Sequence, residues 1–246
     1  AYMQRVQMLH DDVWSALQTG GVKRWQTLSV AVNADSVSTW FLPGVAPLLV
    51  KSKLLIDITI DDQDHTHAAL KSGEALGCVT TLATPMKGCV SEPLGQMRYR
   101  CLANPDLVER CRTPKGQVSI HKLLKLPAII FNQKDALQDT FLFKFFGLQS
   151  PQYPKHYVPA IEAFSQAIEL GLGWGMVPDL LSQLDQPQAQ SNTHSKTVPE
   201  KWVEVVPNAP IDITLYWQHW SHTSEAVTKL TKMVKSAAKE SLLPWA

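Results

Sequence analysis

The sequence predicts an α/β protein with two lobes, and three features of the chain support this fold class. Apolar runs that suit strands alternate with segments of helical periodicity from Leu28 onward. A polar, proline-bearing stretch at 104–116 interrupts this alternation, which then begins again. A last strand and helix follow a second polar stretch at 185–200, expected to be a mobile surface loop, so the C-terminal segment is predicted to complete the first lobe. A chain of 246 residues could form one large α/β domain or two lobes of about 100 residues each, so length alone does not decide between them.

In the first lobe, strands and helices alternate as in a parallel sheet with right-handed crossovers. The stretch Leu28–Trp40 is expected to be a strand that leads into a helix. The further elements expected are a buried helix face from Trp40 to Leu49, a strand at Leu54–Asp62, a helix at about Thr66–Lys71 and a strand at Leu76–Leu82. Ligands of such sheets bind beyond the carboxyl ends of the strands. Here those ends are Asn33–Ser36, Asp61–Asp64 and Thr80–Thr81.

A strand at Met97–Leu102 is expected to leave the first lobe for the second. The second lobe is predicted to contain short helices at His121–Leu126 and Asp179–Leu184, strands at Ala128–Asn132 and Trp202–Val206, an extended piece at His156–Pro159, and longer helices at Asp135–Phe146 and Ala160–Leu170. A strand at Ile211–Trp220 and a helix at Ser224–Leu243 return to the first lobe. Two lobes joined by two crossing strands form a ligand cleft that can close by hinge motion.

Residues 1–19 show the pattern of a coiled-coil seam. Their apolar or small residues are spaced alternately by four and three positions, at Tyr2, Val6, Leu9, Val13 and Ala16. So short a helix is not stable alone in water. We therefore expect it to pack on a partner chain or to be the end of a longer helix that begins before residue 1.

Composition excludes several classes of function. The net charge is +1, with 18% charged and 45% hydrophobic residues, which fits a globular protein whose own surface does not grip DNA. No stretch approaches the roughly 20 apolar residues of a membrane span, so a cytoplasmic location without membrane contact is expected. The four cysteines form no C-x-x-C pair. No hydrolase, phosphate-loop or zincin motif is present, so neither an enzyme nor a cofactor is predicted.

The start of the helix in Leu28–Trp40 is a candidate anion site. The first N–H groups of a helix lack partners inside it, and the aligned peptide dipoles add partial positive charge, so a carboxylate or phosphate can bind there. Ser36, and Thr39 on the following turn, are the hydroxyl side chains proposed for this site. In the alternative interpretation, Asp35 or Ser36 only caps the helix, a contribution of about 1 kcal/mol.

Acidic residues at predicted strand and helix ends form a second candidate set. Asp35, Asp62, Asp64 and Glu162 could together receive a cationic group, because a partly desolvated cation needs a paired carboxylate. Two other motifs are weaker. The glycines of 171–175 follow a helix and lead into a strand, the reverse of the dinucleotide-binding order. The histidines and acids of 62–67 suit a solvated loop better than a metal site.

Several segments together resemble the effector-binding part of LysR-type transcriptional regulators. The matching segments are Ala31–Ser36 with Trp40, Leu70 to Val79 with Gly73, Glu74 and Gly77, Glu162–Phe164, Gly171–Pro178, and Leu215–Trp217. The region 171–178 is similar to the general pattern. The strings VNADS and LYW are similar to the branch called ArgP, IciA or LysG, which responds to lysine and arginine. The resemblance covers nearly the whole chain.

The resemblance implies a periplasmic-binding-protein-like (type II) fold and a homodimer or homotetramer. It implies 1–19 as the end of a linker helix, 28–96 with 207–246 as lobe I, and 97–206 as lobe II. Promoter DNA would be bound only by an N-terminal winged helix-turn-helix that this chain lacks. The sequence departs from the branch at Asn132–Lys134, where an acidic position is expected, and a lysine there disfavours a basic effector.

The predicted function is the sensing of a small effector, lysine or arginine, by a regulator. The carboxylate of the effector is expected at Ser36 and at the hydroxyl of Thr80 or Thr81. The cationic end of the effector is expected at Asp35, Asp62 or Glu162. The full candidate set is Asp35, Ser36, Thr39, Asp62, Thr80, Asn132 and Glu162. The alternative is the extracytoplasmic substrate-binding protein of an amino-acid transporter, which has the same two-lobed plan.

Overall fold

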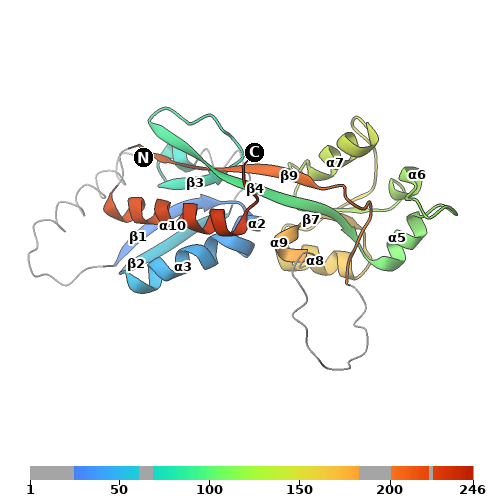
Figure 1. Ribbon diagram of the computed structural model, residues 1–246, viewed down its shortest axis with the longest axis horizontal. Coiled ribbons are helices and arrows are strands. Elements are labelled where there is room, and N and C mark those ends of the chain that lie inside the picture. The colour runs from blue at the N-terminus through green and yellow to red at the C-terminus, as the bar shows by residue number, and fades with distance from the viewer. Residues whose placement is uncertain (1–24, 61–68, 183–200, 222–223, 246) are drawn as a thin grey trace, which may run out of the picture. The chain divides into compact units, whose positions relative to one another are not determined.

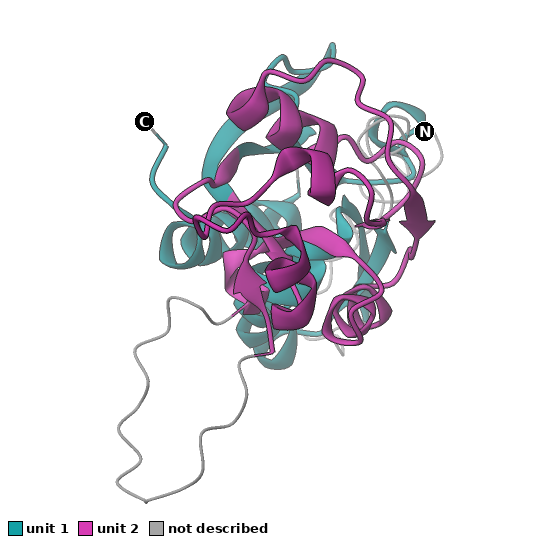
Figure 2. Cartoon of the chain, turned by 90° about the vertical axis from the view of Figure 1, so that its right-hand side faces the viewer, with its two compact units in different colours: residues 1–97, 213–246 teal, residues 98–212 magenta. Residues whose placement is uncertain are grey.

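The computed structural model describes residues 25–60, 69–182, 201–221 and 224–245. The chain forms two compact units (Figure 2). Unit 1 comprises 1–97 and 213–246, and unit 2 comprises 98–212. The expected seam in 1–19 and the loop at 185–200 lie outside the described residues.

Unit 1 is built on three parallel strands, β1 (Gln26–Val32), β2 (Leu54–Ile60) and β3 (Gly77–Thr80). β1 lies between the other two, with Val32 opposite Ile60 and Ala31 opposite Cys78. The apolar residues explain this order, because β1 and β3 are buried on both faces while β2 alternates as an edge strand does. The parallel sheet predicted for the first lobe is therefore confirmed, and its strands end at one edge.

A continuous helical segment follows β1. It consists of α2 (Ala34–Ser36), a π-helical turn η1 (Val37–Phe41) and α3 (Leu42–Lys51). Pro43 has no N–H to donate to the carbonyl of Thr39, so the regular α-helical pattern is interrupted at this point. The Thr39 hydroxyl donates a hydrogen bond to the Asp35 carbonyl at 2.6 Å. The predicted strand-to-helix transition is confirmed, with a π-turn that the sequence did not reveal.

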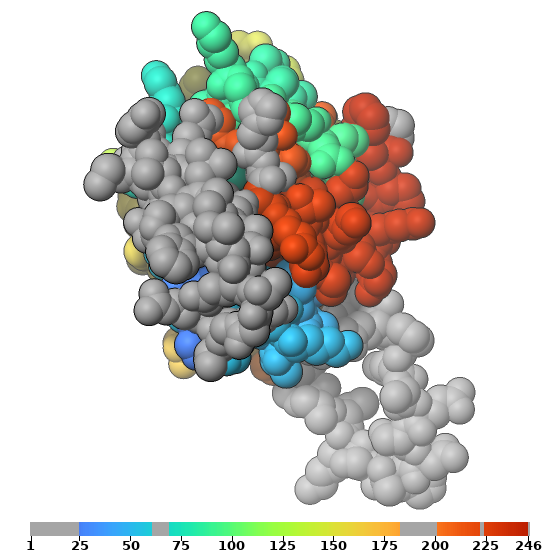
Figure 3. Space-filling view, turned by 90° about the vertical axis from the view of Figure 1, so that its left-hand side faces the viewer, coloured from blue at the N-terminus to red at the C-terminus, as the bar shows by residue number. Residues whose placement is uncertain are grey.

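The C-terminal segment from Ile213 onward belongs to unit 1. β9 (Ile211–Trp220) pairs antiparallel with β3, with Trp217 opposite Val79. α10 (Glu225–Ser241) packs beside α3 (Figure 1), and residues of both helices lie at the face shown in Figure 3. Two close approaches fix this packing, because a Cβ on Gly77 would meet the Trp217 ring at 2.4 Å and one on Gly44 would meet the Ala237 Cβ at 2.1 Å.

Unit 2 also has a parallel centre. β5 (Ala128–Ile130) pairs in parallel with β6 (Lys155–Tyr157) and β7 (Trp174–Pro178), while β4 (Cys89–Ala103) and β7 are antiparallel. β8 (Val203–Glu204) adds two residues beside β4. The helices of this unit are α5 (Pro105–Cys111), α6 (Ile120–Leu123), α7 (Leu137–Phe146), α8 (Ile161–Glu169) and α9 (Asp179–Ser182).

The strand expected at Met97–Leu102 is confirmed within β4, although β4 begins eight residues earlier, at Cys89. The polar, proline-bearing stretch 104–116, for which no helix was predicted, contains α5. The helix starts there because Asn104 accepts a hydrogen bond from the Asp106 N–H at 3.0 Å and Pro105 occupies the first turn.

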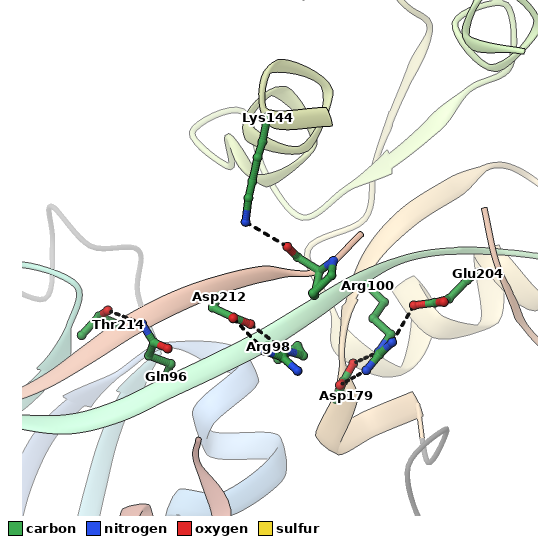
Figure 4. A network of polar contacts seen from close by, with 9 residues as sticks. Gln96, Arg98, Arg100, Lys144, Asp179, Glu204, Asp212 and Thr214 are labelled. Carbon is green, nitrogen blue, oxygen red and sulfur yellow. Dashed lines mark hydrogen bonds and ion pairs between the residues drawn. The ribbon is translucent and has the colours of Figure 1, made fainter. Parts of the chain in front are cut away.

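Two arginines of β4 organise the ionic contacts of unit 2 (Figure 4). Arg100 binds both carboxylate oxygens of Asp179 at 2.8 and 3.1 Å and Glu204 at 2.8 Å, which ties α9 and β8 to β4. Hydrogen bonding from Arg100 to Asp179, and to a smaller extent to Glu204, raises the pKa of the Arg100 guanidinium. Arg98 binds Asp212 through two hydrogen bonds of 2.7 and 2.9 Å. Bidentate pairs of this kind fix geometry as well as charge.

The contact between Gly77 and Trp217 predicts a stability effect. In Gly77→Ala, the new methyl group must displace a fully buried indole ring, so we expect the free energy of unfolding to fall by about 1–3 kcal/mol. Urea denaturation measures this. Val50→Ala removes a side chain that is 85% exposed and should change stability by less than about 0.5 kcal/mol. Equal stability of Gly77→Ala and the wild type would contradict the packing described.

The Arg98–Asp212 pair predicts a pH dependence. The hydrogen bonds from Arg98 lower the pKa of Asp212, so its ionised form stabilises the fold above its unfolded-state pKa, and this contribution is lost as pH falls through the folded-state pKa. Asp212→Asn should remove that acidic component and cost up to about 1 kcal/mol at neutral pH, because the pair is partly exposed. Denaturation at pH 7 and below pH 4 tests this, with exposed Asp57→Asn as the control. Parallel pH profiles of Asp212→Asn and the wild type would contradict it.

Candidate functional site

The carboxyl edge of the unit 1 sheet leads directly into a helix start. Asn33 occupies the N-cap position in extended conformation, with φ −67° and ψ 150°. The first hydrogen bond of the helix runs from the Val37 N–H to the Asn33 carbonyl at 3.1 Å. The N–H groups before Val37 therefore have no acceptor within the helix, and the dipole adds partial positive charge at this end. An anion would be stabilised here.

The capping alternative for Asp35 and Ser36 was wrong. The helix begins at Ala34, so Asp35 and Ser36 are its second and third residues, and the N-cap residue Asn33 makes no side-chain capping bond. The helix starts this early because Asn33 continues the extended backbone of β1 and Ala34 is a strong helix former. The Ser36 side chain therefore serves another purpose than capping.

Three polar side-chain atoms at this helix start are buried without a hydrogen-bond partner among the described residues. They are the Asn33 Oδ1, the Ser36 Oγ and the Trp40 Nε1. Ser36 and Trp40 are only 0% and 2% exposed. An unsatisfied buried polar group costs about 1–3 kcal/mol, so a cluster of them calls for an explanation. The sequence placed Trp40 on a buried helix face and Asn33 at a strand end, because a burial pattern gives no sign of an unused donor or acceptor.

The other candidates of unit 1 differ in availability. Thr80 ends β3, is 2% exposed, and its hydroxyl accepts the Leu82 N–H at 3.2 Å. Extending the pairing of Ala31 with Cys78 by two positions places Thr80 beside Asn33 at the same edge. The Thr39 hydroxyl is committed to the Asp35 carbonyl, so it stabilises the helix. Asp35 is half-buried, and Asp62 lies outside the described residues.

In unit 2, Asn132 and Asp135 form a closed turn after β5. The Asn132 Oδ1 accepts the N–H groups of Lys134 at 2.9 Å and of Asp135 at 3.2 Å. The Asp135 carboxylate accepts the N–H groups of Phe131 and Leu137. Burial raises the pKa of Asp135, although these two hydrogen bonds oppose the shift. Sequence analysis found no acid at 132–134, and the structure shows the next residue, Asp135, turned back to the end of the strand.

Glu162 lies in the first turn of α8, and its side chain is exposed. Ile130 of β5 pairs with Tyr157 of β6 in parallel, so Asn132 and the start of α8 follow strands that end at the same edge. A carboxylate in the first turn also interacts favourably with the helix dipole, worth about 0.3–1 kcal/mol. Glu162 is thus accessible to a cationic group, and it stabilises α8 as well.

The glycines of 171–175 have a structural role, whereas the histidines and acids of 62–67 lie outside the described residues. A Cβ on Gly173 would meet the Pro127 carbonyl oxygen at 2.4 Å, and one on Gly175 would meet the Ile168 side chain at 2.9 Å, so these glycines allow α8 and β5 to pack against β7. All four cysteines are free thiols. Within the described ranges, His, Cys, Asp and Glu side chains form no group of three or more that could hold a metal ion. None of the helices described is long and apolar enough to cross a membrane.

These features place an anion-attracting helix start and the buried Thr80 at the carboxyl edge of the unit 1 sheet. The family model of the LysR substrate binding domain matches residues 26–239. The chain therefore belongs to the LysR substrate-binding domain family, the effector-binding class of domain of LysR-type transcriptional regulators.

Its relatives are regulators named ArgP and LysG. The chain is 32% identical over 247 aligned positions to the HTH-type transcriptional regulator ArgP of Pseudomonas fluorescens, covering 99% of this chain and 77% of the relative. The crystal structure of ArgP from Mycobacterium tuberculosis superimposes with a TM-score of 0.83 at 32% identity, covering 98% of this chain and 76% of that one. Full-length LysG of Corynebacterium glutamicum with bound effector Arg gives 0.78 at 28% identity, with coverages of 98% and 76%. The expected periplasmic-binding-protein-like α/β fold is confirmed.

The turn at Asn132 predicts a local stability effect. Asn132→Ala removes the acceptor of two N–H groups, and we expect a loss of about 1–2 kcal/mol in the free energy of unfolding. Urea denaturation measures it. Gln133→Ala, at the exposed neighbouring position, should leave stability within about 0.5 kcal/mol of the wild type. If both variants behave alike, the turn does not depend on Asn132.

Proposed function

We propose that this domain binds a basic α-amino acid, arginine or lysine, as the effector of a transcriptional regulator. The observation that carries the proposal is Ser36, a fully buried hydroxyl with no partner among the described residues, at a helix start that attracts carboxylates. Two likenesses support the choice of ligand. The relatives include ArgP and LysG regulators, and the LysG structure from Corynebacterium glutamicum contains the effector Arg.

In this proposal the effector carboxylate lies at the helix start, near Ser36 and Thr80. Both are buried residues at the carboxyl edge of unit 1. The cationic end of the effector requires an acid, for which Asp35, Asp62 and Glu162 are the candidates. The Asn132 Oδ1 already accepts two backbone N–H groups, so it does not serve as an acceptor for a cation. In this proposal the side-chain amide N–H groups of Asn132 donate to a ligand oxygen.

Regulation would follow from differential affinity, because an effector shifts a conformational equilibrium only as far as it binds one state better than the other. The proposal includes a cytoplasmic homodimer or homotetramer that contacts promoter DNA through a winged helix-turn-helix domain outside this chain. Family membership does not support the transporter alternative, since the relatives found are named as transcriptional regulators.

Calorimetric titration with L-arginine and L-lysine tests the proposal. We expect binding of at least one of them to the wild type, and a loss of roughly 10- to 150-fold in affinity for Ser36→Ala, which removes one hydrogen bond to a charged group worth about 1.5–3 kcal/mol. Ser38→Ala is the matched control, because Ser38 is an exposed serine two residues further along. Its affinity should equal that of the wild type. The absence of heat with either amino acid at millimolar concentration would refute the ligand assignment.

A further inference from the structure

The three unpartnered polar atoms of the helix start lie on one face of the helix. Asn33, Ser36 and Trp40 are spaced by three and then four positions, the spacing of neighbours along a helical face. Ser36 directly precedes the π-turn at Val37–Phe41, and Trp40 lies within this turn. Single π-turns inside helices are rare and frequently occur at functional sites.

The spacing of four positions favours a Trp40 ring that leans toward Ser36. Long side chains of a helix lean toward its N-terminus and cover the preceding turn. The preceding turn contains Ser36, whose hydroxyl is shielded from solvent like the indole nitrogen of Trp40. The Trp40 and Phe41 rings form a T-shaped contact with their centroids 5.8 Å apart, and the Trp40 Nε1 has no hydrogen-bond partner among the described residues. By contrast, the Trp217 indole N–H donates to the Thr231 hydroxyl at 3.0 Å.

The chemistry of these groups matches the head of an α-amino acid. An indole N–H can only donate, and a serine hydroxyl can donate, so both suit a carboxylate at the positive end of the helix. The unpartnered atom of Asn33 is its Oδ1, an acceptor that suits an ammonium group. An α-amino acid carries its carboxylate and its ammonium on the same carbon, and this helix face offers donors beside an acceptor.

We propose that Trp40 and Asn33 are recognition residues of the effector site: the Trp40 N–H joins Ser36 in binding the α-carboxylate, and the Asn33 Oδ1 accepts from the α-ammonium. This inference rests on the proposed function and extends it to how the head group is read. Unit 1 thereby selects an α-amino acid over a simple amine or a simple carboxylic acid. The identity of the effector's side chain is left to the acidic residues.

Three ligands separate the two contacts. L-Arginine carries both head groups, agmatine lacks the carboxylate, and 5-guanidinopentanoate lacks the α-ammonium. In calorimetric titrations, Trp40→Phe should weaken arginine and 5-guanidinopentanoate roughly tenfold and leave agmatine unchanged. Asn33→Ala should weaken arginine and agmatine and leave 5-guanidinopentanoate unchanged; Asn33 makes no side-chain capping bond, so the helix start should survive. Trp202→Phe is the matched control, because its Nε1 is also buried and unpartnered but lies in unit 2.

The indole N–H signal of Trp40 gives a direct readout that does not depend on variant stability. The signal is assigned in ¹⁵N-correlated NMR spectra by its absence in Trp40→Phe. In the wild type it should shift when saturating arginine is added and should not shift when agmatine is added. If the wild type binds arginine while Trp40→Phe and Asn33→Ala bind it equally well and the signal does not move, the groups hold ordered water and the inference fails. If the wild type binds no arginine or lysine at all, the proposed function itself fails.

Discussion

The parallel pairing of β1 with β2 on one side and β3 on the other determines where the functional groups of unit 1 lie. Since β1 is buried on both faces, its register cannot slip without exposing apolar side chains. That register fixes the point at which the chain leaves the sheet, and there Asn33 turns it into a helix. The N-terminal end of the helix and the last residue of β3, Thr80, are thereby held at one edge. Trp217, packed on Gly77, supports the same sheet from β9.

Arg100 of β4 and the helix start of unit 1 differ in how their polar groups are partnered, although unpartnered buried atoms such as the Trp202 Nε1 also occur in unit 2. In unit 2, Arg100 is matched by the carboxylates of Asp179 and Glu204, so its charge is fully engaged in holding the fold. In unit 1, Ser36 and Trp40 are buried with no partner for their polar atoms among the residues described. A satisfied network rigidifies a structure, whereas unsatisfied groups destabilise it until a ligand or water meets them. This difference is why the helix start, and not the ionic network, is the place where we expect a ligand.

Hydrophobic periodicity was sufficient to predict most elements of the fold. The strands at 54–60 and 211–220 and the helix at 225–241 were predicted because their apolar residues recur with a spacing typical of these elements. The helix α5 was not predicted because only three of its residues, Leu107, Val108 and Cys111, form the apolar face and polar residues surround them in the sequence. Its start signal, Asn104 followed by Pro105 and Asp106, was nevertheless present in the sequence. The early start of β4 was missed because Pro93 and Gly95 within it resemble loop residues.

The sequence by itself determined the alternation of strands and helices, the parallel sheets, and the family, because each depends on residue types at fixed spacing. Only the tertiary structure decided how individual polar groups are used. It showed that Ser36 does not cap its helix, that the Thr39 hydroxyl binds a backbone carbonyl, and that Asp135 closes the turn after β5. Whether a buried donor has a partner depends on atoms from elements distant in the chain. Spacing along the sequence carries no record of those contacts, so the unused hydrogen-bonding groups at Asn33 and Trp40 became visible only after folding placed them in the interior.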